Sequence, residues 1–597
     1  MKDFFKMFFA SALAIGVVFV GGSLFMIMVL IGIGSMADPV PIVPEKSVLV
    51  FDMTANIQDS PVGLTQQEIF NEAMGKNVSL RMSLRETLRA IEEAGSDSRI
   101  TGLYLKGSNR PSGYASGFAA LREVRDAIVA FKASGKPVIA NVVAPNARDL
   151  YLISAADKVF MNPEGMVMNS GMVSQPIFFA GFFEKYGIGV QVTKAGEYKS
   201  ATEPLVRENM SEPAREQATV LLGDLWKEYV SAISEKTGMS YDEFQGLVDS
   251  KGFLLARDAV EIGLVDELAF TDKVLHELVA LGGPGDDEAE FSATGMSSYI
   301  RSLDMGKSAR KEHVAVVYAE GSIVVGESSE GKIGGDGLAR EIRKLRNDES
   351  VKAIVLRVNS PGGSSLASEV IAHELDLARE KMPVVISMGT VAASGGYWIS
   401  AYSDHIFAEP NTITGSIGVF GVFFNFESLA NRHGLNVDTV KTGKFADIMT
   451  VARPKTDEEM DIIQAFVDQT YQDFLDKVSG GRSMPVEEVE KIAEGRVWSG
   501  TAALKIGLVD ELGGLSDAIA HAGVLAGLED DPAVRDYPKA KDFFEELKKN
   551  LMKSSISSMV GETYAPAGQV LEELDSLSNF NDPMGAYSIL PFKIEIQ

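Results

Sequence analysis

Apolar residues near the start of the chain form one long run. Residues 8–36 contain no charged side chain, and a helix needs about 20 apolar residues to cross a bilayer. Lys2 and Lys6 precede the run, which by the positive-inside rule keeps the N-terminus in the cytoplasm. We predict a single-pass transmembrane anchor over residues 1–37, in the inner (cytoplasmic) membrane, with the rest of the chain on the extracytoplasmic, periplasmic side. Residues 35–37 (SMA) also resemble a small-residue cleavage site, so cleavage of the anchor stays an alternative.

After the anchor, short apolar runs alternate with amphipathic stretches. In the later half of the chain, strands are expected at residues 314–318, 353–358, 384–387 and 405–408, and a helix at 366–379. Continuous apolar strands separated by helices are typical of α/β proteins whose sheets are covered on both faces. The pattern predicts an α/β fold without naming a particular one.

An internal repeat divides the chain into two units. The heptapeptide IGLVDEL occurs at residues 262–268 and again at 506–512, and residues 137–139 and 151–154 match residues 383–385 and 397–400 with almost the same offset. Such self-similarity indicates two homologous domains.

The repeat fixes the expected domain boundaries. We predict a first α/β domain at residues 47–280 and a second at 312–530. The Gly-, Ser- and Asp-rich residues 281–311 are expected to be a linker. Residues 531–597 are expected to be an acidic tail, with an amphipathic helix at 539–552.

Composition narrows the function. The formal net charge is −27, which argues against a nucleic-acid partner because nucleic acid needs a basic surface. The chain has no cysteine, which excludes a thiol nucleophile, a disulfide framework and a Cys-ligated metal. Neither an H-E-x-x-H zinc motif nor a Walker A motif occurs. We therefore expect no metal and no cofactor.

Ser394 is a candidate nucleophile. It lies in GTVAASGGYWIS (residues 389–400), between a predicted strand and a helical run. Its small neighbours let a substrate approach the hydroxyl, and a following helix N-terminus directs N–H groups at developing negative charge. The spacing is not that of a G-x-S-x-G nucleophile elbow. Taken alone, such a serine is more often a tight packing point.

Asn359–Ser364, NSPGGS, follows another predicted strand. Its two glycines can expose successive backbone N–H groups, which is how an oxyanion hole is built. A plain turn is the competing interpretation.

The repeat connects Ser394 with a lysine. The first-half counterpart of Ser394 is Arg148, and the second-half counterpart of Lys199 is Ala446. Each half thus keeps one member of a pair, as a composite site across two domains would. A serine needs a base, and a lysine can serve once burial lowers its pKa toward neutrality. Without the repeat, a solvated surface charge would be the preferred interpretation of Lys199.

Four motifs together resemble the signal peptide peptidase A, or protease IV, family of membrane-bound serine peptidases. They are NSPGGS, GTVAASGGYWIS, TGSIGV (residues 414–419) and GEYKSA (residues 196–201). The resemblance covers nearly the whole chain and matches the long, tandem-domain form. It implies two Clp-protease/crotonase-like domains, a homotetramer on the membrane, and remnant signal peptides as substrates.

The resemblance also implies roles for individual residues. Ser394 matches the nucleophile and Lys199 the general base. The backbone oxyanion hole is expected at Gly362, Gly363 and Gly395. Ser416 matches the serine that orients the lysine amine, and its first-half counterpart is Asn169. Because Ala446 replaces the second-half lysine, the dyad must cross from one domain to the other.

Three rival functions remain at this point. A Ser-His-Asp hydrolase would use His405 beside Asp404. A crotonase-type acyl-CoA enzyme would share the fold and the oxyanion turn, although CoA chemistry is cytoplasmic and the anchor argues against it. A non-catalytic membrane scaffold would need neither Ser394 nor Lys199.

Overall fold

The computed structural model describes residues 42–61, 81–109, 115–285, 290–303, 311–329, 331–528, 532–538, 582, 585–590 and 595–596. Within these ranges no helix is long and apolar enough to span a bilayer. The predicted anchor at residues 1–37 and the predicted amphipathic helix at 539–552 lie outside the described residues.

Each repeat is built on a mainly parallel sheet, and six strands follow the same order in both sheets. The first runs β11(Glu267–Leu268), β6(Lys158–Met161), β5(Val138–Val142), β4(Ile100–Lys106), β1(Ser47–Asp52), β12(Ala293–Gly295). In the second, the matching strands are β23(Glu511–Leu512), β19(His405–Ala408), β18(Val384–Ala393), β16(Val351–Ser360), β13(His313–Glu320), β24(Val534–Tyr537). The second sheet also contains β20(Ile413–Gly415), parallel to β18, and β22(Val497–Ser499), antiparallel to β20. The two tandem α/β units predicted from the sequence are thus present.

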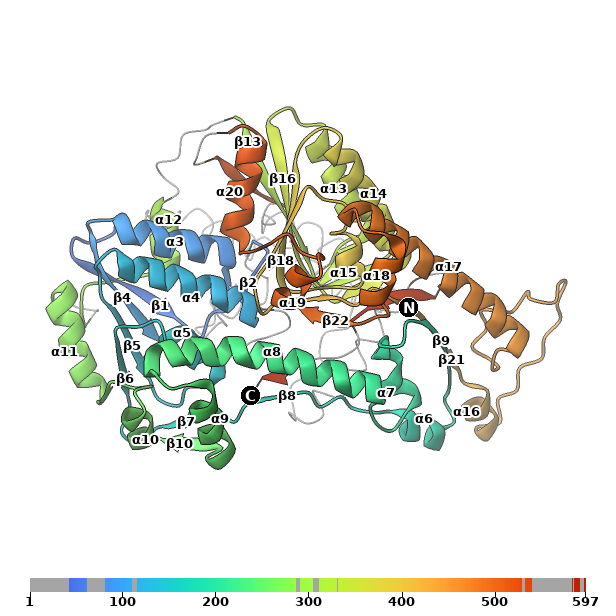
Figure 1. Ribbon diagram of the computed structural model, residues 1–597, viewed down its shortest axis with the longest axis horizontal. Helices are drawn as coiled ribbons and strands as arrows, with labels where there is room; N and C mark the ends of the chain where they lie inside the picture. Colours follow the sequence, from blue (N-terminus) through green and yellow to red (C-terminus); the bar gives the residue numbers. More distant parts are fainter. Residues whose placement is uncertain are drawn as a thin grey trace, which may run out of the picture.

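Helices cover these sheets (Figure 1). The helices of the first repeat are α3(Leu84–Ser96), α4(Phe118–Ala133), α5(Ala147–Ile153), α6(Ala180–Tyr186), α7(Glu203–Val206), α8(Glu212–Thr237), α9(Tyr241–Ser250), α10(Ala256–Glu261), α11(Thr271–Gly282) and α12(Met296–Leu303). Those of the second are α13(Gly335–Arg346), α14(Ser365–Arg379), α15(Gly395–Trp398), α16(Glu427–Arg432), α17(Asp457–Arg482), α18(Val486–Ile492), α19(Gly500–Lys505) and α20(Leu515–Leu525). The strands between them are buried on both faces, so their sequences are continuously apolar.

The repeated sequence motifs have equivalent structural roles. The Asp157 carboxylate accepts the Val138 N–H at 2.9 Å, and Asp404 accepts the Val384 N–H at 2.8 Å. The aspartates of the two IGLVDEL copies do the same for the next strand: Asp266 accepts from Val159 and Asp510 from Ile406. Each carboxylate satisfies a backbone N–H at the start of a strand, which explains why the motif occurs twice.

Two expected boundaries differ from the structure in the same way. Strand β12 and helix α12 lie inside the segment expected to be a linker, and β12 pairs with β1. Strand β24 lies inside the expected tail and pairs with β13. Both strands are the short outer strands of their sheets, and their polar surroundings gave no strand pattern in the sequence.

The two repeats share a further sheet. Its order is β15(Lys332–Gly334), β14(Ser322–Val324), β17(Gly362–Ser364), β25(Ala586–Ile589), β21(Val419–Asn425), β9(Gly189–Ala195). Strand β9 belongs to the first repeat, whereas β21 belongs to the second. Helix α8 runs beneath both repeats in Figure 1, and its Leu221 and Leu225 pack against Val391 and Ile413 of the second repeat.

A buried ionic cluster also joins the repeats. Arg357 on β16 donates to Asp59 at 2.7 Å and to Glu123 on α4 at 2.6 Å, and its side chain is fully buried. Burial acts to lower the pKa of Arg357, but the charges of Asp59 and Glu123 raise it above its usual value. Asp59 also accepts from Asn359, whose side-chain oxygen accepts the Val391 N–H. The cluster therefore holds the end of β16 and the adjacent part of β18 against the first repeat.

Asp59→Asn should destabilise the protein, because it leaves the buried Arg357 guanidinium with one carboxylate instead of two. Loss of one partner in a buried pair costs about 3–5 kcal/mol, so the midpoint of urea denaturation should fall clearly. The matched control is Glu327→Gln, which breaks an exposed pair with Arg340 and should change stability by less than about 1 kcal/mol. Equal shifts for the two variants would contradict the role given to the cluster.

Candidate active site

Ser394 lies at the junction between strand β18 and helix α15. Its backbone has φ 58° and ψ −113°, a conformation that costs a non-glycine residue about 1–3 kcal/mol. The Ser394 N–H donates to the Gly415 carbonyl at 2.8 Å, and the Ser394 carbonyl accepts the Trp398 N–H at 2.8 Å. These bonds fix the strained turn, and the fixed turn sets the direction in which the Ser394 hydroxyl points from the end of β18.

Lys199 comes from the first repeat and contacts Ser394 across the seam, which is the interface between the two repeats. Its Nζ is hydrogen-bonded to Ser394 Oγ at 2.6 Å, and the lysine is fully buried. It follows β9, which pairs with β21 of the second repeat from Val419↔Ala195 to Asn425↔Gly189. The structure therefore brings together the two residues that the repeat predicted to form a pair.

The loop around Gly495 of the second repeat holds Lys199 in place. The Tyr198 N–H donates to the Glu494 carbonyl at 2.8 Å. A side chain at Gly495 would come within 2.7 Å of the Lys199 backbone nitrogen and Cβ, so only glycine fits there. In the same loop, the Arg496 carbonyl accepts the Ser416 N–H at 2.7 Å. One loop thus positions both Lys199 and Ser416.

Ser416 completes the surroundings of the amine. Lys199 Nζ donates to the Ser416 carbonyl at 2.9 Å and lies 3.0 Å from Ser416 Oγ. No carboxylate contacts the lysine among the described residues, and burial lowers its pKa well below the usual value. An uncharged amine can accept a proton, which an ammonium group cannot.

The glycine turn lies directly beside the nucleophile. A side chain at Gly362, whose φ is 100°, would collide with the Ser588 carbonyl oxygen and come within 2.7 Å of the Gly395 nitrogen. The Gly362 N–H donates to Ser360 Oγ at 3.2 Å, so Gly362 supplies space rather than a free donor. The Gly363 and Gly395 N–H groups, which border this space, are the better donors for an oxyanion.

A strand from the C-terminal part of the chain occupies the space in front of Ser394. Strand β25 pairs antiparallel with β17, with Gly363 opposite Ser588, and antiparallel with β21. Ser588 Oγ lies 2.5 Å from Ser394 Oγ and donates to the Gly418 carbonyl at 3.1 Å. This strand was not expected from the sequence. The short apolar run AYSIL between Gly585 and Pro591 is the signal that could have revealed it.

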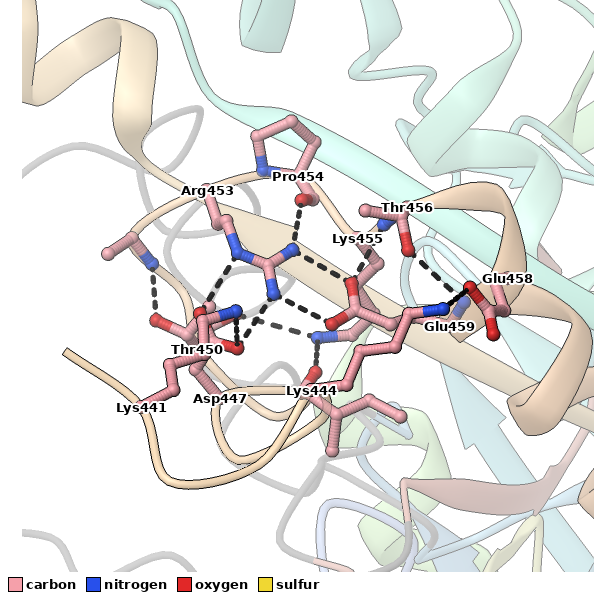
Figure 2. A network of polar contacts seen from close by, with 12 residues as sticks. Lys441, Lys444, Asp447, Thr450, Arg453, Pro454, Lys455, Thr456, Glu458 and Glu459 are labelled. Carbon is pink, nitrogen blue, oxygen red and sulfur yellow. Dashed lines mark hydrogen bonds and ion pairs between the residues drawn. The ribbon is translucent and has the colours of Figure 1, made fainter. Parts of the chain in front are cut away.

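The second-repeat counterpart of Lys199 lies in a surface loop. Ala446 is exposed, and its neighbour Asp447 pairs with Arg453, which also binds Glu459 at 2.7 Å (Figure 2). Hydrogen bonds from Arg453 hold the pKa of Asp447 well below its usual range and lower that of Glu459 to about 2. This loop therefore holds an ion-pair network where the first repeat carries the buried lysine.

The histidine that sequence analysis kept as a rival base lies elsewhere. His405 on β19 pairs with Val385 of β18, nine residues before Ser394. At about 3.3 Å per residue this separation is on the order of 25–30 Å. Asp404 is bound to the Val384 N–H and to Arg379, and His405 faces Glu511 and stacks on His521. The arrangement gives no support to a Ser-His-Asp triad built on these residues.

A serine hydroxyl beside a buried lysine amine whose pKa is lowered is one of the arrangements that acyl-transfer enzymes use, so the geometry points to serine hydrolases as a class. The family model "Peptidase family S49" matches residues 130–283 and 376–529. The chain therefore belongs to peptidase family S49, with two tandem domains, and is a serine peptidase.

Curated relatives agree with this assignment. "Protease 4" of Haemophilus influenzae is 34% identical over 97% of this chain and 96% of its own. "Protease 4" of Salmonella typhi is 36% identical over 91% and 90%, and "Serine protease SPPA, chloroplastic" of Arabidopsis thaliana is 34% identical over 74% and 65%. Among solved structures, a mutant of ClpP1 from Listeria monocytogenes covers 34% of this chain and 94% of its own at 15% identity and a TM-score of 0.24. That score is too low to support the predicted Clp-protease/crotonase-like fold, which stays a prediction.

Lys199→Met should stabilise the protein at neutral pH. The unfolded chain protonates this amine below about pH 10.4, whereas the folded state resists protonation because its pKa is lowered. Stability of the wild type should therefore rise with pH between the lowered folded-state pKa and about 10.4. The stability gained by Lys199→Met should shrink over the same range, in urea denaturation measured at several pH values. Lys194→Met, at an exposed lysine of the preceding strand β9, should gain nothing, and parallel pH curves for wild type and Lys199→Met would refute a neutral lysine.

Proposed function

We propose that the protein is a membrane-anchored serine endopeptidase that uses a Ser394–Lys199 dyad. The observation that carries the proposal is the 2.6 Å contact between Ser394 Oγ and the fully buried Lys199 Nζ, with no carboxylate among the described residues to keep the amine charged. A neutral amine at that distance is placed to take the hydroxyl proton.

The mechanism follows from these contacts. Lys199 takes the proton of Ser394 as its Oγ attacks a peptide carbonyl. The Gly363 and Gly395 N–H groups stabilise the oxyanion. Lys199 then gives the proton to the leaving amine, and an acyl-enzyme forms. Water, activated by Lys199, hydrolyses the ester. Ser416 orients the amine throughout through its carbonyl and hydroxyl.

Remnant signal peptides are the proposed substrates, and the extracytoplasmic side of the inner membrane is the proposed location. The charge-free run at residues 8–36 supports an anchor. The likeness to the signal peptide peptidase A family supports the substrate class and a homotetramer. An extended chain already lies against the glycine turn as β25, which supports a site that binds peptides as an added strand.

Fluorophosphonate labelling of the detergent-solubilised full chain tests the dyad. Wild type should be labelled, and Ser394→Ala and Lys199→Ala should each reduce labelling and peptide hydrolysis by at least about 10³-fold, because nucleophile and base act as one unit. Lys194→Ala is the matched control and should behave as wild type, since that lysine is exposed and donates only to the Glu197 carbonyl among the described residues.

Each other outcome has a defined meaning. Labelling that survives in Lys199→Ala would refute the lysine base and require a histidine. A folded wild type that neither reacts nor hydrolyses peptide would refute the peptidase proposal and favour a membrane scaffold. Circular dichroism of every variant separates these results from misfolding.

A further inference from the structure

Lys199 is the central residue of a tight backbone turn. The Ser200 N–H donates to the Tyr198 carbonyl at 2.8 Å, and Lys199 has φ −73° and ψ 75°. These angles and this hydrogen bond define an inverse γ-turn, in which residues i and i+2 are joined around the residue between them. Because the turn has a single internal hydrogen bond, the direction of the lysine side chain depends on what holds the two ends of the turn.

One side chain holds both ends. Gln217 lies on α8 and is only 1% exposed. Its Nε2 donates to the Tyr198 carbonyl at 2.9 Å and to Ser200 Oγ at 3.0 Å. An amide nitrogen carries two hydrogens, and each of them here has an acceptor, one on either side of Lys199. The side chain therefore clamps the turn from within the protein.

The oxygen of the same amide binds the second repeat. Gln217 Oε1 accepts the Val497 N–H at 3.3 Å. The carbonyl of that peptide unit, which belongs to Arg496, accepts the Ser416 N–H at 2.7 Å. Ser416 in turn contacts Lys199 Nζ through its carbonyl and its hydroxyl. The turn, the glutamine and the residue beside the amine thus form one closed chain of hydrogen bonds across the seam.

We propose that Gln217 is a positioning residue, which holds the backbone of Lys199 so that the amine stays aligned with Ser394 Oγ. The inference rests on the dyad proposed above. Among the described residues, the side-chain hydrogen bonds of Gln217 go to Tyr198, Ser200 and Val497. It therefore acts on the amine through the turn and not by direct contact.

An uncharged amide suits this position for an electrostatic reason. The turn offers two acceptors, the Tyr198 carbonyl and Ser200 Oγ, so the clamp needs donors, whereas an ionised carboxylate only accepts. A negative charge buried near Lys199 would also favour the ammonium form and raise the pKa of the lysine. Gln217 holds the turn without opposing the loss of the proton.

The preceding residue provides a matched control. Glu216 joins the same two segments at the surface: its half-exposed carboxylate accepts the Tyr198 hydroxyl at 3.3 Å and pairs with Arg496 at 3.1 Å. Exposed pairs of this kind contribute little to stability. Glu216→Gln therefore changes the same helix and the same surroundings but leaves the clamp on the Lys199 backbone intact.

The rate of fluorophosphonate labelling of the detergent-solubilised full chain, measured against probe concentration, tests the role. Gln217→Met keeps a side chain of similar length but removes its hydrogen bonds. The maximal labelling rate should fall at least about tenfold, because a small displacement of a reacting group is costly. The half-saturating probe concentration should stay within about twofold, because no contact with the probe is lost. Glu216→Gln should label like wild type.

The pH dependence of the same rate separates positioning from a general loss of stability. Wild-type labelling should fall as the pH drops through the lowered pKa of Lys199, because the protonated amine cannot accept the Ser394 proton. In Gln217→Met the amine is less completely enclosed, so its pKa should rise toward the usual value. The fall should then occur at a higher pH, whereas Glu216→Gln should keep the wild-type midpoint.

The possible failures are distinct. Gln217→Met that labels at the wild-type rate with the wild-type pH midpoint would overturn the inference and leave the dyad standing. If circular dichroism shows that Gln217→Met is unfolded, Ser200→Ala decides, because it removes only one acceptor of the clamp. It should lower the rate by a smaller factor and shift the midpoint in the same direction, and an unchanged rate and midpoint would overturn the inference. Labelling that survives in Lys199→Ala would overturn the dyad and this inference together.

Discussion

The lysine amine buried without a carboxylate is the constraint on which the site depends. A charged ammonium group cannot be taken from water without large cost unless it is paired, so burial lowers the pKa of Lys199. Neither repeat alone encloses Lys199. The first supplies the residue, and the second supplies Ser416, the Glu494–Gly495 loop and strand β21, which cover it. The proposed chemistry therefore requires that the two repeats be docked.

This requirement explains why the two repeats differ at the positions of Ser394 and Lys199. The two sheets keep the same order, and the paired aspartates keep the same backbone bonds. In contrast, Arg148 replaces the serine in one half, and an exposed ion-pair loop replaces the lysine in the other. Contacts that hold each sheet together are duplicated, whereas contacts at the seam, such as Arg357 with Asp59, exist once. The seam is where a single asymmetric site fits between two similar domains.

The parts of the structure that follow from local sequence patterns could be predicted. The apolar runs located the central strands, and helix α14 begins one residue before its expected start. The repeat paired Ser394 with Lys199, because a residue lost in one copy and kept in the other is visible in one chain. Strands β12, β24 and β25 were missed, since they are short and owe their form to partners far away in sequence. The sequence pattern also did not show that the Gly362 N–H is already used, because it donates a hydrogen bond to Ser360 in the folded turn.

The position of the two reacting residues along the chain has a consequence for biosynthesis. Lys199 and Ser394 are 195 residues apart, and at about 5–20 residues per second the ribosome needs roughly 10–40 s to pass from one to the other. A nascent chain that has made only its first repeat holds Lys199 but lacks Ser394, its proposed partner. Strand β25, which closes the shared sheet, is among the last segments to be made. If the proposed dyad is the catalytic unit, the chain therefore cannot hydrolyse peptides until its second repeat has been made, and the order of its residues delays activity without a separate inhibitor.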